Sequence, residues 1–283
     1  MHYTFKVRQD GLERQEDSRY VGVQTDLFLA SLHASRLTPH PLTCFCCENS
    51  RLTLHFSVDS NLAIIIPVRL FPDKLPSVLD QVMQYISPDR VLVVNDGYSG
   101  LSVMIGQEMG VHLILHRKKL GKGISLREGF KFWRERGMEW AITLDGDGQH
   151  DPSDLPKFID AAQRNRADLV IGSRMLSSNG MPWDRRFSNR TSSFIISHII
   201  GKKIPDSQCG FRLVRLEALE GIIWREDGFA FESEMILRFS QKNLVIDYIP
   251  IRTVYEPNQE SSIRRLPDTF RFLRMIARSR QPI

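Results

Sequence analysis

The chain has 283 residues, a formal net charge of +5 and a sequence pI of about 9.1. With 42% hydrophobic and 25% charged residues, it has the composition of an ordinary soluble globular protein. Its apolar runs are shorter than the roughly 18 residues that a transmembrane helix needs, and its first residues lack the apolar core of a signal peptide. These features exclude a membrane-spanning protein and predict a cytoplasmic one, with one large domain or two small ones.

Residues 1–60 match no motif, and we treat them as an N-terminal extension of unknown role. Apolar residues alternate at Leu52, Leu54, Phe56 and Val58, which is typical of a strand that pairs with the main sheet.

A strand–helix alternation starts at residue 61 and defines a main domain over residues 61–255. Continuous apolar segments typical of buried strands lie at 62–68, 90–94, 111–115, 141–144 and 167–171. Helices are predicted at 76–86, 101–109, about 124–136 and 155–164. This order predicts an α/β fold with a mostly parallel central sheet covered by helices on both faces.

The region after residue 204 is less regular, with a helix predicted over 229–241 and a strand over 244–251. The C-terminal segment, residues 256–283, predicts a basic amphipathic helix. Such a helix can lie peripherally on anionic lipid at the inner face of a membrane. The alternative is a helix that packs on the domain with its arginines in water. Basic charge also suits nucleic acid, but no nucleic-acid motif accompanies it, so we expect no nucleic-acid partner.

Polar and glycine-rich segments follow several predicted strands directly. They are Asn95-Asp96, Gly121-Lys122-Gly123, Asp145 to Asp147 and Gly172-Ser173-Arg174. Ligands of parallel α/β sheets bind beyond the carboxyl ends of the strands. We therefore expect these segments to form one site.

The segment Asp145-Gly146-Asp147-Gly148-Gln149-His150 carries the strongest chemical signal. Its glycines let the backbone turn sharply and approach a ligand closely. Carboxylate and amide oxygens are hard ligands that suit Mg²⁺ or Mn²⁺ shared with a substrate's phosphates. The alternative for an isolated pair of this kind is a solvated Asp-Gly turn.

Taken in order, these segments resemble the family 2 glycosyltransferases, and most closely the dolichyl-phosphate mannose synthase-like group without its C-terminal transmembrane helices. The resemblance spans about residues 61–276. It rests on Ile66-Pro67, Asn95-Asp96-Gly97, Leu120 to Gly123, Asp145 to His150, Gly172 to Arg174, Gln208 to Arg212 and Phe231 to Glu234. It implies a Rossmann-like GT-A fold, a nucleoside-diphosphate sugar donor, a divalent metal and inversion at the anomeric carbon.

The resemblance also implies roles for individual residues. The predicted donor-binding residues are Pro67, Val68, Asp96, Gly121, Lys122, Asp145, Gly146 and Arg174. The predicted metal-binding residues are Asp145, Asp147 and Gln149, and the predicted catalytic residues are Asp147, Arg212, Glu232 and Glu234. Two departures, Val68-Arg69-Leu70 after the first strand and Asn95 in place of a frequent aspartate, leave the donor open between UDP- and GDP-sugars.

Two acceptor classes stay open. Guanidinium groups bind phosphate in a bidentate manner, so Arg185, Arg190 and Arg212 suit an acceptor phosphate, which favours a polyprenyl phosphate. A hydroxyl acceptor on a glycan would need a general base, and Glu232 or Glu234 could supply it. A phosphate acceptor is already anionic and needs none.

Two other functions are disfavoured by the sequence. A nucleotidyltransferase is disfavoured because its glycine-rich signature with an arginine after the first strand is missing. A degenerate protein that only binds nucleotide sugar is disfavoured by the intact pair of Asp145 and Asp147.

Overall fold

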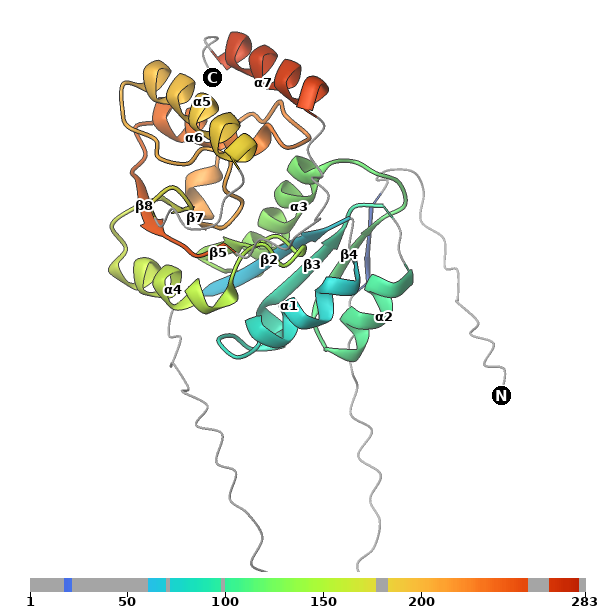
Figure 1. The fold of residues 1–283 in the computed structure, drawn as a ribbon. Helices are drawn as coiled ribbons and strands as arrows, with labels where there is room; N and C mark the ends of the chain where they lie inside the picture. Colours follow the sequence, from blue (N-terminus) through green and yellow to red (C-terminus); the bar gives the residue numbers. More distant parts are fainter. Residues whose placement is uncertain are drawn as a thin grey trace, which may run out of the picture.

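A computed structural model describes residues 18–21, 61–69, 72–97, 100–176, 183–253 and 265–279. Its centre is an eight-stranded sheet in the order β1-β4-β3-β2-β5-β7-β6-β8 (Figure 1). The strands are β1 (Ser18–Val21), β2 (Leu62–Val68), β3 (Val91–Asn95), β4 (His112–His116), β5 (Trp140–Thr143), β6 (Leu169–Ser173), β7 (Arg212–Arg215) and β8 (Ile246–Pro250).

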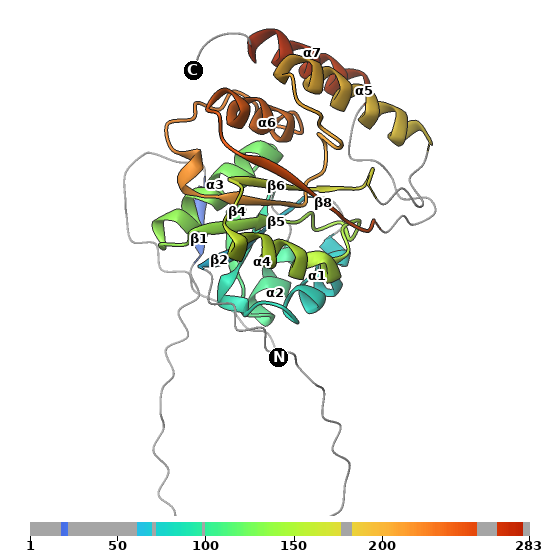
Figure 2. The same ribbon diagram turned by 90° about the vertical axis from the view of Figure 1, so that its left-hand side faces the viewer.

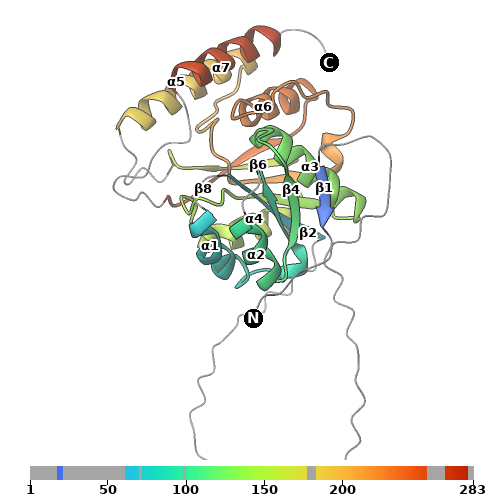
Figure 3. The same cartoon turned by 90° about the vertical axis from the view of Figure 1, so that its right-hand side faces the viewer.

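The helices are α1 (Leu75–Val82), α2 (Gly100–Glu108), α3 (Lys122–Glu135), α4 (Leu155–Arg164), α5 (Trp183–Ile200), α6 (Phe231–Gln241) and α7 (Arg265–Ser279). Short 3₁₀ turns lie at Pro72–Lys74, Pro88–Arg90, Pro152–Asp154 and Glu217–Leu219. Helices α1, α2 and α4 cover one face of the sheet, and α3 and α6 cover the other (Figure 2). Helices α5 and α7 form a further layer outside α6 (Figure 3). The predicted sheet with helices on both faces is confirmed.

The central strands are apolar throughout because both of their faces are covered. In β2 and β3 every residue except Pro67 is buried. Helix α3 lies very close to β2: a Cβ on Gly129 would approach Ile65 Cγ2 to 2.7 Å. At the same contact, Trp133 Nε1–H donates to the Ile64 carbonyl at 3.2 Å. This pairing fixes the start of α3 relative to the strand ends.

Strand β7 was not predicted from the sequence, and it decides the arrangement of the second half. It lies between β5 and β6 and runs antiparallel to both, with Thr143 and Ile171 each opposite Arg212. The end of β5, the end of β6 and the start of β7 therefore meet at one edge. The remaining strands of the main domain pair in parallel: β4-β3-β2-β5 on one side and β6-β8 on the other.

The predicted strand around Leu52 to Val58 lies outside the described residues. Within the predicted N-terminal extension, β1 is described, and it pairs antiparallel with β4 at the edge of the sheet.

The packing of helix α7 does not support the expected membrane contact through the C-terminal segment. Its Met275 is 3% exposed, and Phe272 and Ile276 pack against the domain core. These three side chains pack within the protein, whereas Leu273 is 51% exposed. None of the described helices is long and apolar enough to cross a membrane.

Candidate functional site

The site lies at the edge where β2, β3, β5 and β6 end and β7 begins. At the end of β5, Gly146 passes so close to β2 that a Cβ there would meet Val68 Cγ2 at 2.7 Å. From β7, the carbonyl of Gly210 accepts a hydrogen bond from the Thr143 hydroxyl at 2.6 Å. The predicted segments at 67–68, 145–147 and 208–212 are therefore in contact.

Lys122, at the first position of α3, is the central cation of the site. Its Nζ lies 2.6 Å from Asp145 Oδ1 and 2.6 Å from Glu232 Oε1. The Lys122 side chain is 14% exposed and that of Glu232 only 4%. Burial alone would lower the pKa of Lys122, but the two acids more than offset this and raise it. The lysine is therefore charged at physiological pH.

Gly210 covers the Lys122–Asp145 pair. A Cβ on Gly210 would lie 2.8 Å from both Asp145 Oδ2 and Lys122 Nζ. A larger residue would displace the ion pair, so this glycine is explained by close approach of the backbone.

Asp147 lies beside this cluster and differs from Asp145 electrostatically. Burial raises the pKa of Asp147, repulsion from Asp145 adds to it, and the result is about 6. Lys122 instead holds the pKa of Asp145 below its usual value, against the effect of burial. Asp147 Oδ1 accepts the Gln149 N–H at 3.0 Å, which orders the turn. A second positive charge near Asp147 would relieve this repulsion.

The residues predicted to bind a metal fit a divalent cation, because a cation would offset the repulsion between Asp145 and Asp147. Asp147 is a half-buried carboxylate in a like-charge environment, with the Gln149 amide in the same turn. Asp145 has one oxygen in the ion pair with Lys122. Clusters of three or more His, Cys, Asp or Glu side chains, which could bind a metal unaided, do not occur among the described residues. A cation here would need oxygen ligands from a substrate, as Mg²⁺ often does.

His150 stabilises the same turn through a hydrogen bond to the backbone of Asp145. It was not among the predicted site residues. Its Nδ1 accepts the Asp145 backbone N–H at 3.2 Å, which requires an unprotonated Nδ1. Burial lowers the pKa of His150 to about 4, so the ring is neutral at physiological pH. Its role is to hold the Asp145 backbone.

Asp96, predicted to contact the nucleotide, lies buried among partners of its own. Its carboxylate accepts N–H groups from Leu120 at 2.6 Å and Gly121 at 3.0 Å. His116 Nδ1 lies 3.1 Å from it, and His116 Nε2 lies 2.8 Å from Glu128. Burial opposes the charge of His116, but these two acids raise its pKa to about 9. Asp96 therefore organises the 117–121 loop, in addition to any contact with a ligand.

The backbone N–H groups of Gly121 and Gly123 are bound within the protein. The Gly121 N–H is bound to Asp96, and the Gly123 N–H donates to the Asp227 carbonyl at 2.8 Å. A Cβ on Gly121 would lie 2.2 Å from that same carbonyl oxygen. Both glycines are thus explained by packing against the 226–228 segment, and Lys122 alone of the three faces the acids of the site.

Arg174, at the end of β6, is ion-paired with a buried acid that the sequence analysis did not select. Its Nε and Nη2 donate to Asp206 at 2.8 and 2.9 Å. Asp206 also accepts from the side chain of Asn189 on α5 at 2.9 Å. The pair links β6, α5 and the loop before β7.

Arg212, predicted to contact an acceptor phosphate, is enclosed by backbone carbonyls. It is 1% exposed, and its Nε, Nη1 and Nη2 donate to the carbonyls of Cys209, Glu232 and Ser207 at 2.7, 2.6 and 2.9 Å. Each guanidinium nitrogen thus donates to a backbone carbonyl. Arg212 holds the Cys209–Gly210 turn and the first turn of α6.

Glu234, one of the two predicted candidates for a base, is bound by backbone N–H groups. Its carboxylate accepts the backbone N–H groups of Arg225 at 3.0 Å and Glu226 at 2.9 Å. It is 3% exposed and lies 3.6 Å from Arg238 Nε. Glu232, two residues earlier, faces Lys122 instead. Spacing by two on a helix turns side chains to different sides, and only the structure decides which one faces the site.

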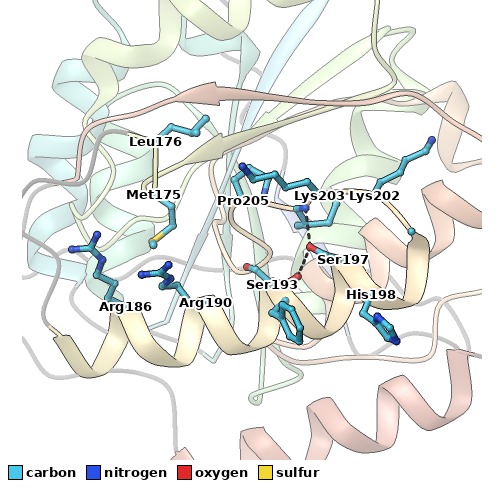
Figure 4. Close-up of a pocket in the computed structure, with 13 residues that line it drawn as sticks. Met175, Leu176, Arg186, Arg190, Ser193, Ser197, His198, Lys202, Lys203 and Pro205 are labelled. Atoms are coloured by element: carbon cyan, nitrogen blue, oxygen red, sulfur yellow. Dashed lines mark hydrogen bonds between the residues drawn. The ribbon is translucent and has the colours of Figure 1, made fainter.

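A groove of about 670 Å³ runs along α5 (Figure 4). Arg186 and Arg190 extend from α5 toward Met175, in the segment that follows β6. Lys202 and Lys203 lie near its other end. Of the predicted acceptor residues, Arg190 therefore lines this groove. Arg185 is on the same helix, and its side chain lies outside the described ones.

His116, Glu128 and Asp206 were missed because their partners lie 12 or more residues away in the sequence, whereas the partner of His150 lies in its own motif. The sequence did contain one signal, since His150 and Asp206 belong to or adjoin the motifs that carry the resemblance.

Comparison with known families identifies the chain. Residues 63–223, more than half of the sequence, match the family model for "Glycosyl transferase family 2". The chain belongs to glycosyl transferase family 2. It is a glycosyltransferase, and the predicted resemblance is confirmed.

Named relatives of this glycosyltransferase act on lipid phosphates. It is 28% identical over 200 residues to polyprenol monophosphomannose synthase of Mycolicibacterium smegmatis, covering 66% of this chain and 75% of the relative. It is also 28% identical over 210 residues to undecaprenyl-phosphate mannosyltransferase of Micrococcus luteus, covering 70% and 86%.

Similar solved structures confirm the GT-A fold. Glucosyl-3-phosphoglycerate synthase of Mycobacterium tuberculosis has a TM-score of 0.61 at 12% identity, covering 79% of this chain and 81% of that one. The same enzyme in complex with Mn²⁺, UDP and glucosyl-3-phosphoglycerate also has a TM-score of 0.61, at 10% identity and with the same coverage.

Substituting Gly121 tests the packing of the Lys122 turn. We expect Gly121→Ala to destabilise the fold by more than about 2 kcal/mol, because its φ of +116° and the Asp227 carbonyl both oppose a Cβ. Gly137→Ala is the matched control, since its φ is +76° with open space around it, and should cost about 1 kcal/mol. Urea unfolding measures both, and equal losses would contradict the packing argument.

His116 predicts a pH dependence of stability. Its folded pKa of about 9 exceeds the ordinary value of 6.5, so its stabilising effect is complete below pH 6.5 and is lost as the pH rises through 9. We expect wild-type protein to lose more stability between pH 6.5 and 9.5 than His116→Gln does. Denaturation midpoints across this range measure the difference. The exposed His198→Gln should behave as wild type, and an identical pH profile for His116→Gln would refute the role of the pair.

Proposed function

We propose that this glycosyltransferase transfers a sugar from a UDP- or GDP-sugar to a polyprenyl phosphate, with inversion at the anomeric carbon and a bound Mg²⁺ or Mn²⁺. The observation that carries the proposal is the charged cluster of Lys122, Asp145 and Asp147 at the strand ends. Similar solved structures hold UDP with Mn²⁺ or Mg²⁺, and named relatives use polyprenyl phosphates as acceptors.

Asp147 and Gln149 would hold the cation, with Asp145 at its side. When bound, the metal stabilises the charge that builds on the departing diphosphate. Lys122 supplies a fixed positive charge next to the same group, because Asp145 and Glu232 keep it in place. Pro67 and Val68, at the end of β2, and Asp96, after β3, lie where the nucleoside would bind.

The acceptor would reach the site through the α5 groove. Arg186 and Arg190 provide two guanidinium groups for a phosphate, and Met175, Leu176 and Ile204 provide apolar contacts. Arg185, on the same helix, is proposed as a further phosphate ligand. The phosphate oxygen attacks the anomeric carbon from the face opposite the diphosphate, the new C–O bond forms as the bond to the diphosphate breaks, and the nucleoside diphosphate leaves.

A hydroxyl acceptor is the second candidate, and the position of Glu232 favours it. Glu232 is a carboxylate beside Lys122 in the candidate site. A carboxylate in this position could accept the proton of an acceptor hydroxyl as a general base. With a phosphate acceptor the same carboxylate only positions Lys122.

Turnover of Asp147→Ala tests the proposed donor site. UDP- and GDP-sugars are assayed with extracted polyprenyl phosphate and Mn²⁺. We expect at least a hundredfold loss of turnover, because a Lewis acid next to the leaving group is lost. Asp160→Ala, an exposed aspartate on α4, is the control and should retain activity. Near-normal turnover of Asp147→Ala would overturn the metal assignment.

Glu232→Gln and Glu234→Gln separate the two acceptor classes. With a phosphate acceptor, Glu232→Gln should mainly raise KM for the donor, about tenfold, and leave the acid limb of the kcat pH profile in place. A thousandfold fall in kcat with loss of that limb would favour the hydroxyl acceptor. Glu234→Gln should lower the melting temperature and preserve kcat, because its carboxylate is bound by backbone N–H groups.

A further inference from the structure

Helix α5 has two chemically different sides. Its inner side is small and polar: Asn189, Ser192 and Ser193 are 2 to 5% exposed. Ser193 Oγ accepts the Ser207 N–H at 2.9 Å, and the Asn189 amide donates to Asp206 at 2.9 Å. This side is fully engaged with the loop that leads to the candidate site.

The outer side of α5 is aromatic and cationic. Phe187 is 63% exposed and Phe194 73% exposed, while Arg190 and His198 are also exposed. These four residues are spaced by three or four positions, so they form one stripe along the helix. Exposing two phenylalanines to water on one helix face is unfavourable, and an exposed apolar patch rimmed by polar residues marks an interaction surface.

The charge around this stripe has one sign. The groove beside it is lined by Arg186, Arg190, His198, Lys202 and Lys203, and none of its described lining residues is acidic. Leu176, 54% exposed, adds an apolar side chain at the rim. Aromatic side chains between cations at helical spacing are typical of helices that lie in a membrane interface, and each cation near an anionic surface adds to binding.

We infer that the outer face of α5, with the Lys202-Lys203 turn, docks on an anionic lipid bilayer. The aromatic side chains enter the headgroup region and the cations contact lipid phosphates. The inner side of the helix stays bound to the 206–207 loop, so the groove opens at the membrane surface. This inference goes beyond the proposed function, because it requires no particular acceptor or donor, and it assigns the contact to α5 and not to α7.

The test uses the full chain and vesicles that contain no polyprenyl phosphate. Co-sedimentation is measured with phosphatidylcholine vesicles and with vesicles that also contain phosphatidylglycerol. We expect binding to the anionic vesicles at least tenfold stronger, and weaker at high salt. Phe187→Ser/Phe194→Ser and Lys202→Gln/Lys203→Gln should each weaken it about tenfold, with unchanged melting temperatures.

Matched controls remove equivalent groups elsewhere. Ile223→Ser/Val245→Ser removes two exposed apolar side chains, and Lys131→Gln/Arg134→Gln removes two exposed cations on α3. Both should bind as wild type. Arg274→Gln/Arg278→Gln tests α7 and should have a smaller effect than the α5 variants.

Three results would overturn the inference. The first is the absence of binding to anionic vesicles, which would indicate that a protein partner covers this face. The second is equal binding to both kinds of vesicle. The third is a loss of binding in the α3 or α7 variants as large as that in the α5 variants. If the vesicle assay fails while polyprenyl phosphate is still glycosylated in detergent, the proposed function survives and only the docking surface is wrong.

Discussion

The ammonium group of Lys122, shared between two acids, is the interaction on which the site depends. Asp145 follows β5, Glu232 begins α6 and Lys122 begins α3, so one cation joins three elements that are distant in sequence. At a buried position two carboxylates repel each other strongly unless a cation lies between them. The glycine at position 210 lets a backbone turn close over the pair. Asp147 lies next to this group, and burial together with repulsion from Asp145 raises its pKa to about 6.

The loops around that cluster are held in place by buried polar side chains that form hydrogen bonds with backbone groups. Arg212 binds three carbonyls and Glu234 binds two N–H groups, and neither faces a ligand. Fully satisfied buried polar networks of this kind make a loop rigid. They explain why charged residues near a catalytic site need not be catalytic. Here the rigid loop between Asp206 and Arg212 also connects the site with α5.

The fold and the strand ends could be predicted from the sequence, but the contacts of several predicted site residues could not. Asp145, Lys122 and Glu232 were selected and are in contact. Arg212 and Glu234 were selected on the same grounds and are not available to a ligand. The difference lies in which way a side chain points. This direction depends on hydrogen-bond partners such as the Ser207 carbonyl and the Arg225 N–H, which the motifs do not specify. His116 and Asp206 were missed for the same reason.

The sequence by itself determined the alternation of apolar strands and helices, the family and the segments that meet at the sheet edge. Those features follow from local periodicity and from motif order, which the chain carries directly. Only the tertiary structure decided that β7 runs antiparallel between β5 and β6, since a four-residue strand has too little local pattern to specify its neighbours. It also decided which acids face Lys122 and which side of α5 faces outward, because both depend on contacts between residues far apart in the chain.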